Sequence, residues 1–80
     1  MTDEAVLIRL TAIFRDIFRD DTIVAMPETT ADDVERWDSL THIDMLLMVE
    51  QDFGIRVPTR AVSRMRNVGD LVALIQNHIA

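Results

Sequence analysis

Hydrophobic residues recur at helical spacing in three segments of this chain, and only residues 55–58 alternate as a strand does. Nothing elsewhere in the sequence is suited to pair with that short stretch. Because the chain has 80 residues and no cysteine, its stability must come from packing the apolar stripes together without disulfides. We therefore predict one all-α domain over residues 1–80, a four-helix bundle with three main helices and one short third helix.

The first predicted helix leads into a long connection. Thr2 or Asp3 suits its N-cap, and its apolar stripe fades at residues 19–21. Residues 20–37 hold Pro27 and acidic pairs, which break any continuous period. Four apolar residues of this connection are expected to fold over the core: Ile23, Val24, Met26 and Val34.

The second predicted helix has the clearest boundaries. Asp38 and Ser39 are both capping types, and Gly54 follows the last apolar residue, as a left-handed C-terminal residue would. We expect Leu40 to turn inward and anchor the first turn. One side of this helix is predicted to carry Leu40, Ile43, Leu46, Leu47 and Phe53. The remaining elements are a short helix over residues 59–65 after Pro58, and a last helix over residues 68–79.

Charge is unevenly distributed along the chain. The net charge is −6, yet the segment after residue 55 is basic. Its arginines are Arg56, Arg60, Arg64 and Arg66. The acidic majority argues against nucleic acid and favours basic partners. No apolar run approaches the roughly 20 residues that span a bilayer, and the N-terminus lacks the basic start of a signal peptide. We expect a monomer in the cytoplasm, with no membrane insertion.

The residues that suggest chemistry lie in the run 36–43. The first turn of a helix has backbone N–H groups without helical partners, and its dipole is positive there. A phosphodiester attached to Ser39 would therefore sit where an anion is favoured. Asp38 can cap the same turn and present a negative charge.

The triplet Asp38, Ser39 and Leu40 resembles the Asp-Ser-Leu attachment motif of acyl carrier proteins. The resemblance continues through residues 41–58 to the Val-Gly-Asp at 68–70. It implies that a phosphopantetheinyl transferase moves a 4′-phosphopantetheine arm from coenzyme A onto Ser39, recognising Asp38 and Leu40. The arm's thiol would carry acyl groups as thioesters to acyl-loading and acyl-transfer enzymes of one pathway, and the carrier itself would not be an enzyme.

Two further sets of residues are expected to serve a carrier. Partner docking is predicted at Trp37, His42, Asp44, Met45, Arg60 and Arg64. A cleft for the acyl chain is predicted at Leu47, Met48, Ile55, Val62 and Met65, although core packing is the alternative for most of them. Trp37 is equally suited to cover the core where the connection meets the second helix.

The resemblance also points away from ordinary fatty-acid synthesis. Housekeeping carriers of that pathway are usually acidic on the short third helix and have a smaller residue at the position of Trp37. Reversed charge at a docking surface repels some partners and admits others. We therefore expect a free-standing bacterial carrier of a specialised lipid or polyketide-type pathway.

Three alternatives remain open. An aminoacyl or peptidyl carrier of a nonribosomal pathway has the same arm and helical plan. A helical protein-interaction module would use Asp38 and Ser39 only as a helix cap. A small hydrolase would pair Ser39 with His42, but the Gly-x-Ser-x-Gly elbow is missing. The acids of the connection lack EF-hand spacing, so no metal site is expected.

Overall fold

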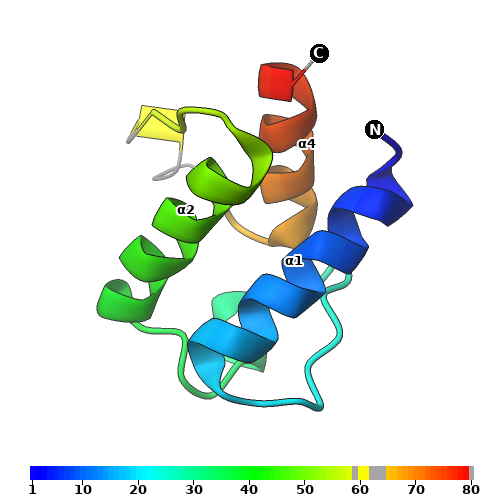
Figure 1. Cartoon of the computed structure of the whole chain (residues 1–80). Coiled ribbons are helices and arrows are strands. Elements are labelled where there is room, and N and C mark those ends of the chain that lie inside the picture. Colours follow the sequence, from blue (N-terminus) through cyan, green and yellow to red (C-terminus); the bar gives the residue numbers. More distant parts are fainter. Residues whose placement is uncertain (59, 62–64, 80) are drawn as a thin grey trace.

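The computed structural model describes residues 1–58, 60–61 and 65–79. Its elements are α1 (Asp3–Phe18), the 3₁₀ turn η1 (Ala31–Asp33), α2 (Ser39–Phe53) and α4 (Val68–Ile79). Helix α1 packs against both α2 and α4 (Figure 1). None of the residues in these ranges forms a strand, so the all-α prediction is confirmed. The predicted short third helix lies largely outside the described residues, although residues 60–61 are helical.

The ends of α1 and α2 follow the predicted signals. The Thr2 hydroxyl accepts a hydrogen bond from the Ala5 N–H at 3.1 Å and caps α1. Helix α1 stops at Arg19 with φ +52°, and α2 stops at Gly54 with φ +66°. Both residues have a left-handed backbone conformation, which only glycine adopts without a steric cost.

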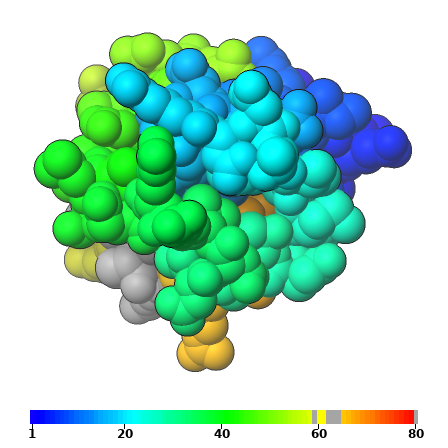
Figure 2. All heavy atoms as spheres, turned by 90° about the horizontal axis from the view of Figure 1, so that it is seen from below, coloured from blue at the N-terminus to red at the C-terminus, as the bar shows by residue number. Residues whose placement is uncertain are grey.

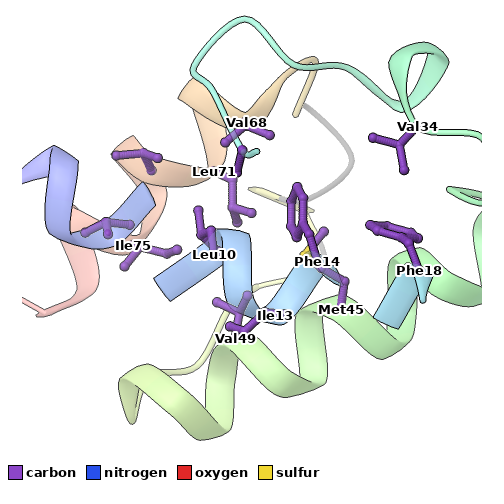
Figure 3. Packing of buried hydrophobic residues seen from close by; sticks show 13 residues of the cluster. Leu10, Ile13, Phe14, Phe18, Val34, Met45, Val49, Val68, Leu71 and Ile75 are labelled. Carbon is purple, nitrogen blue, oxygen red and sulfur yellow. The ribbon is translucent and has the colours of Figure 1, made fainter. Parts of the chain in front are cut away.

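The core is one cluster of buried hydrophobic side chains, drawn in Figure 3. Its described members are Val6, Leu10, Ile13, Phe14, Phe18, Ala25, Val34, Met45, Val49, Val68, Leu71, Val72 and Ile75. Helix α1 supplies five of them and α4 supplies four, whereas α2 supplies only Met45 and Val49. Most of the apolar surface of α2 therefore lies outside the fully buried core.

The long connection covers the core with a different set of residues from the predicted one. Val34 is buried and Ile23 is half-buried, as expected. Val24 and Met26 are 57% and 46% exposed, so the prediction for these two was wrong. Ala25, which lies between them, is buried instead.

Two hydrogen bonds to α1 explain this alternation. The Arg15 Nε–H donates to the Ile23 carbonyl at 2.8 Å, and the Ala25 N–H donates to the Thr11 hydroxyl at 3.0 Å. Residues 23–25 therefore run beside α1. Neighbouring side chains of an extended segment point in opposite directions, so the residues on either side of Ala25 face solvent.

The connection is also tied to the start of α4. The Val68 N–H donates to the Thr29 carbonyl and the Gly69 N–H donates to the Pro27 carbonyl, both at 2.8 Å. A Cβ on Gly69 would lie 3.1 Å from the Pro27 oxygen, so glycine permits this close approach. Asn67 Oδ1 accepts a bond from the backbone N–H three residues later, as an N-cap does. The loop and the cap together satisfy the first turn of α4.

Candidate functional site

The first turn of α2 is held by a reciprocal cap between Asp38 and Thr41. Asp38 Oδ1 accepts hydrogen bonds from the Leu40 N–H at 3.0 Å and the Thr41 N–H at 2.9 Å. The Asp38 N–H donates to Thr41 Oγ1 at 2.9 Å, and the Thr41 hydroxyl donates to the Arg36 carbonyl at 2.8 Å. The Thr41 N–H is the main reason why the pKa of Asp38 lies below its ordinary value. Asp38 is therefore a carboxylate at neutral pH, and its predicted capping role is confirmed.

This cap changes the expected relation between the helix start and a phosphodiester. Two of the first-turn N–H groups, those of Leu40 and Thr41, already donate to Asp38. The same carboxylate offsets part of the positive end of the helix dipole. Fewer donors are left for an anion than the sequence suggested, so the start of α2 positions Ser39 more than it binds a phosphate.

Ser39 and Leu40 both face solvent at this helix start. Ser39 is the first residue of α2 and is exposed. An exposed hydroxyl at a fixed helix start fits a covalent arm, because an external enzyme can reach it. Leu40 is 73% exposed, so the prediction that it turns inward and anchors the turn was wrong.

Trp37 supplies the anchor that Leu40 does not. Its ring packs edge-on against Phe14 with centroids 5.4 Å apart, and lies 5.6 Å from the Phe18 ring. These two phenylalanines are fully buried, so the indole closes the core at the end where α2 begins. The predicted role of Trp37 in covering the core is confirmed, while its role in partner contact stays a prediction.

His42 is held by Trp37. The Trp37 Nε1–H donates to His42 Nδ1 at 2.9 Å, and the two ring planes lie within 22° of parallel with centroids 5.9 Å apart. Burial lowers the pKa of His42, which favours the neutral ring. A neutral imidazole has one acceptor nitrogen, and here Trp37 occupies it. His42 therefore lacks the free acceptor that the base of a serine hydrolase needs.

An exposed apolar stripe lies on α2 directly after Ser39. Besides Leu40, it contains Ile43 and Leu47, which are 56% and 52% exposed. Their spacing of three and four residues places them on one side of the helix. The sequence grouped these residues with Leu46 and Phe53, which are partly buried against the core. Figure 2 views the end of the molecule where α2 starts, and the green atoms of this helix lie at its left edge.

The predicted docking residues differ in how far they are exposed. Asp44 is exposed and His42 is half-buried. Met45 is fully buried in the core, so its prediction as a docking residue was wrong. Arg60 is exposed, and Arg64 lies outside the described residues.

Leu47, Met48, Ile55 and Met65 are the predicted acyl-cleft residues that the structure describes. Leu47 and Ile55 share a shallow hollow of about 350 Å³ with three polar residues. Met48 lines a different groove, beside α1. Met65 packs against the core, and Val62 lies outside the described residues. Of the five, Leu47 and Ile55 are therefore the pair that this hollow brings together.

Thr41 is the site residue that sequence reasoning missed. Its hydroxyl links the α2 cap to the Arg36 carbonyl, and its backbone N–H holds Asp38. The spacing of Asp38 and Thr41, three residues apart at a helix start, is that of a capping box.

In the described part of the chain, no helix is both long and apolar enough to cross a membrane.

Comparison with known proteins identifies the family of the chain. The family model described as "Phosphopantetheine attachment site" matches residues 9–75. An acyl carrier protein of Acidothermus cellulolyticus is 30% identical, over 96% of this chain and 92% of that protein. One from Thermosynechococcus vestitus is 25% identical over 100% and 99% of the two chains. A meromycolate extension acyl carrier protein of Mycolicibacterium smegmatis is 28% identical over 94% and 76%.

A solved structure supports the same conclusion. The solution structure of a holo acyl carrier protein from Geobacter metallireducens matches with a TM-score of 0.84 and 39% sequence identity. The match covers 89% of this chain and 82% of that one. The chain belongs to the acyl carrier protein family, whose members are carriers rather than enzymes and hold a covalent 4′-phosphopantetheine group.

Proposed function

We propose that Ser39 bears the 4′-phosphopantetheine arm and that the protein carries acyl intermediates for a specialised lipid or polyketide-type pathway. The observation that supports the attachment point is that Ser39 is exposed at the start of α2, which Asp38 and Thr41 hold with reciprocal hydrogen bonds. The arm supplies a thiol for thioester chemistry, which the chain cannot supply because it has no cysteine. The cap and Trp37 keep the hydroxyl in one place for the transferase.

The stripe formed by Leu40, Ile43 and Leu47 is the proposed contact surface for enzymes that load or use the arm. It starts one residue after Ser39, and each of its three apolar side chains is more than half exposed. An apolar patch that is left open in this way is typical of an interaction surface. Asp44 is exposed on the same helix and adds a negative charge for basic partners. The hollow between Leu47 and Ile55 is the proposed shelter for the first atoms of an acyl chain.

The specialised pathway is supported by two features of this chain. Arg56, Arg60 and Arg66 are exposed, in a region where housekeeping fatty-acid carriers are usually acidic. Trp37 stands beside the attachment motif, where those carriers have a smaller residue. A relative named for meromycolate extension is an example of a carrier for one dedicated lipid. We expect the protein to work as a monomer in the cytoplasm, whose reducing conditions suit a chain without disulfides.

The attachment point is tested by intact mass. Purified protein is incubated with coenzyme A and a broad-specificity phosphopantetheinyl transferase. We expect a gain of one phosphopantetheinyl unit in the wild type and none in Ser39→Ala. Ser63→Ala is the matched control, because Ser63 is the second of the two serines in the chain. Absence of any gain in the wild type would instead favour a helical interaction module.

The pathway is tested with the modified protein. We expect poor turnover by the malonyl transferase and the ketosynthase of housekeeping fatty-acid synthesis, compared with the carrier native to that system. Efficient turnover by both enzymes would contradict the specialised pathway and leave the attachment point unaffected. Efficient loading by an aminoacyl-activating enzyme would favour the aminoacyl carrier instead.

A further inference from the structure

We propose that Trp37 and His42 form a clasp that positions Ser39 and that opens when His42 takes up a proton. The two side chains enclose Ser39 in the sequence, since Trp37 lies two residues before it and His42 three residues after it. Only the consequence for arm transfer rests on the proposed function. The clasp itself is a property of the apo chain.

The geometry of the clasp connects the attachment site with the core. The indole N–H of Trp37 donates to His42 Nδ1 at 2.9 Å, and the ring planes are within 22° of parallel. The indole of Trp37 also packs against the buried rings of Phe14 and Phe18. His42 belongs to α2, whereas Trp37 belongs to the preceding connection. The bond therefore fixes the angle at which the connection enters the helix that presents Ser39.

Protonation and the clasp exclude each other. The bond needs a lone pair on Nδ1, and an imidazolium carries hydrogen on both ring nitrogens. In the protonated state the N–H of Nδ1 would face the indole N–H of Trp37, so an attractive contact becomes a repulsive one. The ring cannot keep this contact and hold the extra proton at the same time.

The surroundings of His42 favour the closed clasp at neutral pH. Burial lowers the pKa of His42 below its ordinary 6.5, and no charged group contributes to that shift. The elements that meet at the clasp carry charges of both signs. Asp38 caps α2 and Asp44 lies on it, while the connection and the end of α1 carry Glu35, Arg36, Arg15, Asp16, Arg19 and Asp20. The Asp38 carboxylate is already engaged in the helix cap. We therefore expect the clasp to open as the pH falls below 6.5.

Opening the clasp should loosen the junction without unfolding the helix. The cap formed by Asp38 and Thr41 contains no group that titrates in this range, so the first turn of α2 stays formed. Opening the clasp breaks one neutral hydrogen bond. The loss of this bond changes the equilibrium between the closed and the open junction by about threefold to tenfold. Ser39 then samples more orientations relative to the core.

The clasp can be observed directly because Trp37 is the single tryptophan. In ¹⁵N-labelled apo protein, the indole N–H gives one resonance, which we would follow between about pH 8 and pH 5 together with the Ser39 amide. We expect both resonances to shift with one shared midpoint below 6.5. Far-ultraviolet circular dichroism over the same range should stay constant, because the helices persist.

Two variants separate the clasp from other titrations. His42→Gln keeps an acceptor for the indole but cannot titrate, so both resonances should stay constant in this variant. His78→Gln removes the other histidine, which lies at the exposed end of α4, and should titrate like the wild type. A constant indole resonance in the wild type, or a titration that survives in His42→Gln, would overturn the clasp. A titrating indole with a constant Ser39 amide would overturn the positioning of Ser39.

The functional consequence is measured as a ratio. The rate of arm transfer to wild-type protein is divided by the rate to His42→Gln at each pH, which cancels the pH dependence of the transferase. We expect this ratio to fall about threefold to tenfold from about pH 7.5 to pH 5. A constant ratio would overturn the link between the clasp and arm transfer. Because the titration needs no arm, a failure of transfer at every pH counts against the proposed function and not against the clasp.

Discussion

The two sides of α2 use apolar side chains for different purposes. Met45 and Val49 are fully buried and join α2 to the rest of the core. Leu40, Ile43 and Leu47, on the same helix, remain exposed beside Ser39. The buried side holds the helix in place, and the exposed side is available to partners. A hydrophobic residue in a small carrier is therefore not evidence of a core position by itself.

The largest expected effect is on the buried side. Met45→Ala should lower the free energy of unfolding by about 2–5 kcal/mol, because it leaves a cavity in the core. The matched change on the exposed side, Leu47→Ala, should alter it by no more than about 0.5 kcal/mol. Urea unfolding followed by circular dichroism measures both. Equal losses in the two variants would mean that the sides do not differ as described.

A smaller effect is expected on the exposed side, and in function rather than stability. Ile43→Asp and Leu47→Asp should each reduce acyl transfer from the modified protein to its partner enzyme by about tenfold, or about 1.4 kcal/mol, as loss of an interface anchor does. The unfolding midpoint should remain near the wild-type value. Full activity of both variants would remove the stripe from the contact surface.

The two helix ends offer a comparison of similar size. Gly54→Ala should cost about 1 kcal/mol, because the left-handed backbone at φ +66° is strained for alanine even though no atom lies within 4 Å of the added Cβ. Arg19→Gly should stabilise the protein by up to about 1 kcal/mol, since it relieves the same strain at the end of α1. Thermal unfolding of the pair tests this. A loss of stability in Arg19→Gly would show that contacts of the Arg19 side chain outweigh its backbone strain.

The smallest effect concerns the cap of α2, which is a carboxylate, whereas α4 is capped by an amide. Hydrogen bonds lower the pKa of Asp38, so its contribution to stability is present above pH 3.8 and is lost as the pH falls through the lower pKa of the folded state. Asp38→Asn keeps a capping side chain and should remove that part of the acid dependence. Unfolding midpoints of the two proteins should therefore converge at low pH. A constant difference between them would show that the charge of Asp38 plays no part.

Much of the fold could be predicted from the sequence because its signals are local. Thr2, Asp38 and Gly54 have side chains or backbone freedom that suit a helix end in almost any context. The candidate site came from the resemblance of the triplet Asp38, Ser39 and Leu40 to the carrier motif, and the capping pattern placed that triplet at a helix start. These predictions needed no knowledge of the neighbouring elements.

The errors arose where packing between elements decides. A helix with apolar residues at positions 40, 43, 45, 47 and 49 offers more than one apolar stripe, and only the position of α1 selects the one that contains Met45. Val24 and Met26 face solvent because Ala25 donates its N–H to α1, a contact between residues 14 apart. The bond between Trp37 and His42 was missed for a similar reason. Trp37 precedes the helix, so helical spacing does not predict where its ring lies.

The central claim is that Ser39 is the attachment point, and site-specific mass spectrometry tests it most directly. The chain has no lysine, so trypsin cleaves it after arginine and releases residues 37–56 and residues 61–64 as separate peptides. Ser39 lies in the first peptide and Ser63 in the second. After incubation with coenzyme A and the transferase, the added mass should lie on residues 37–56, and fragmentation should assign it to Ser39. An added mass on residues 61–64, or on Thr41 within the first peptide, would contradict the account.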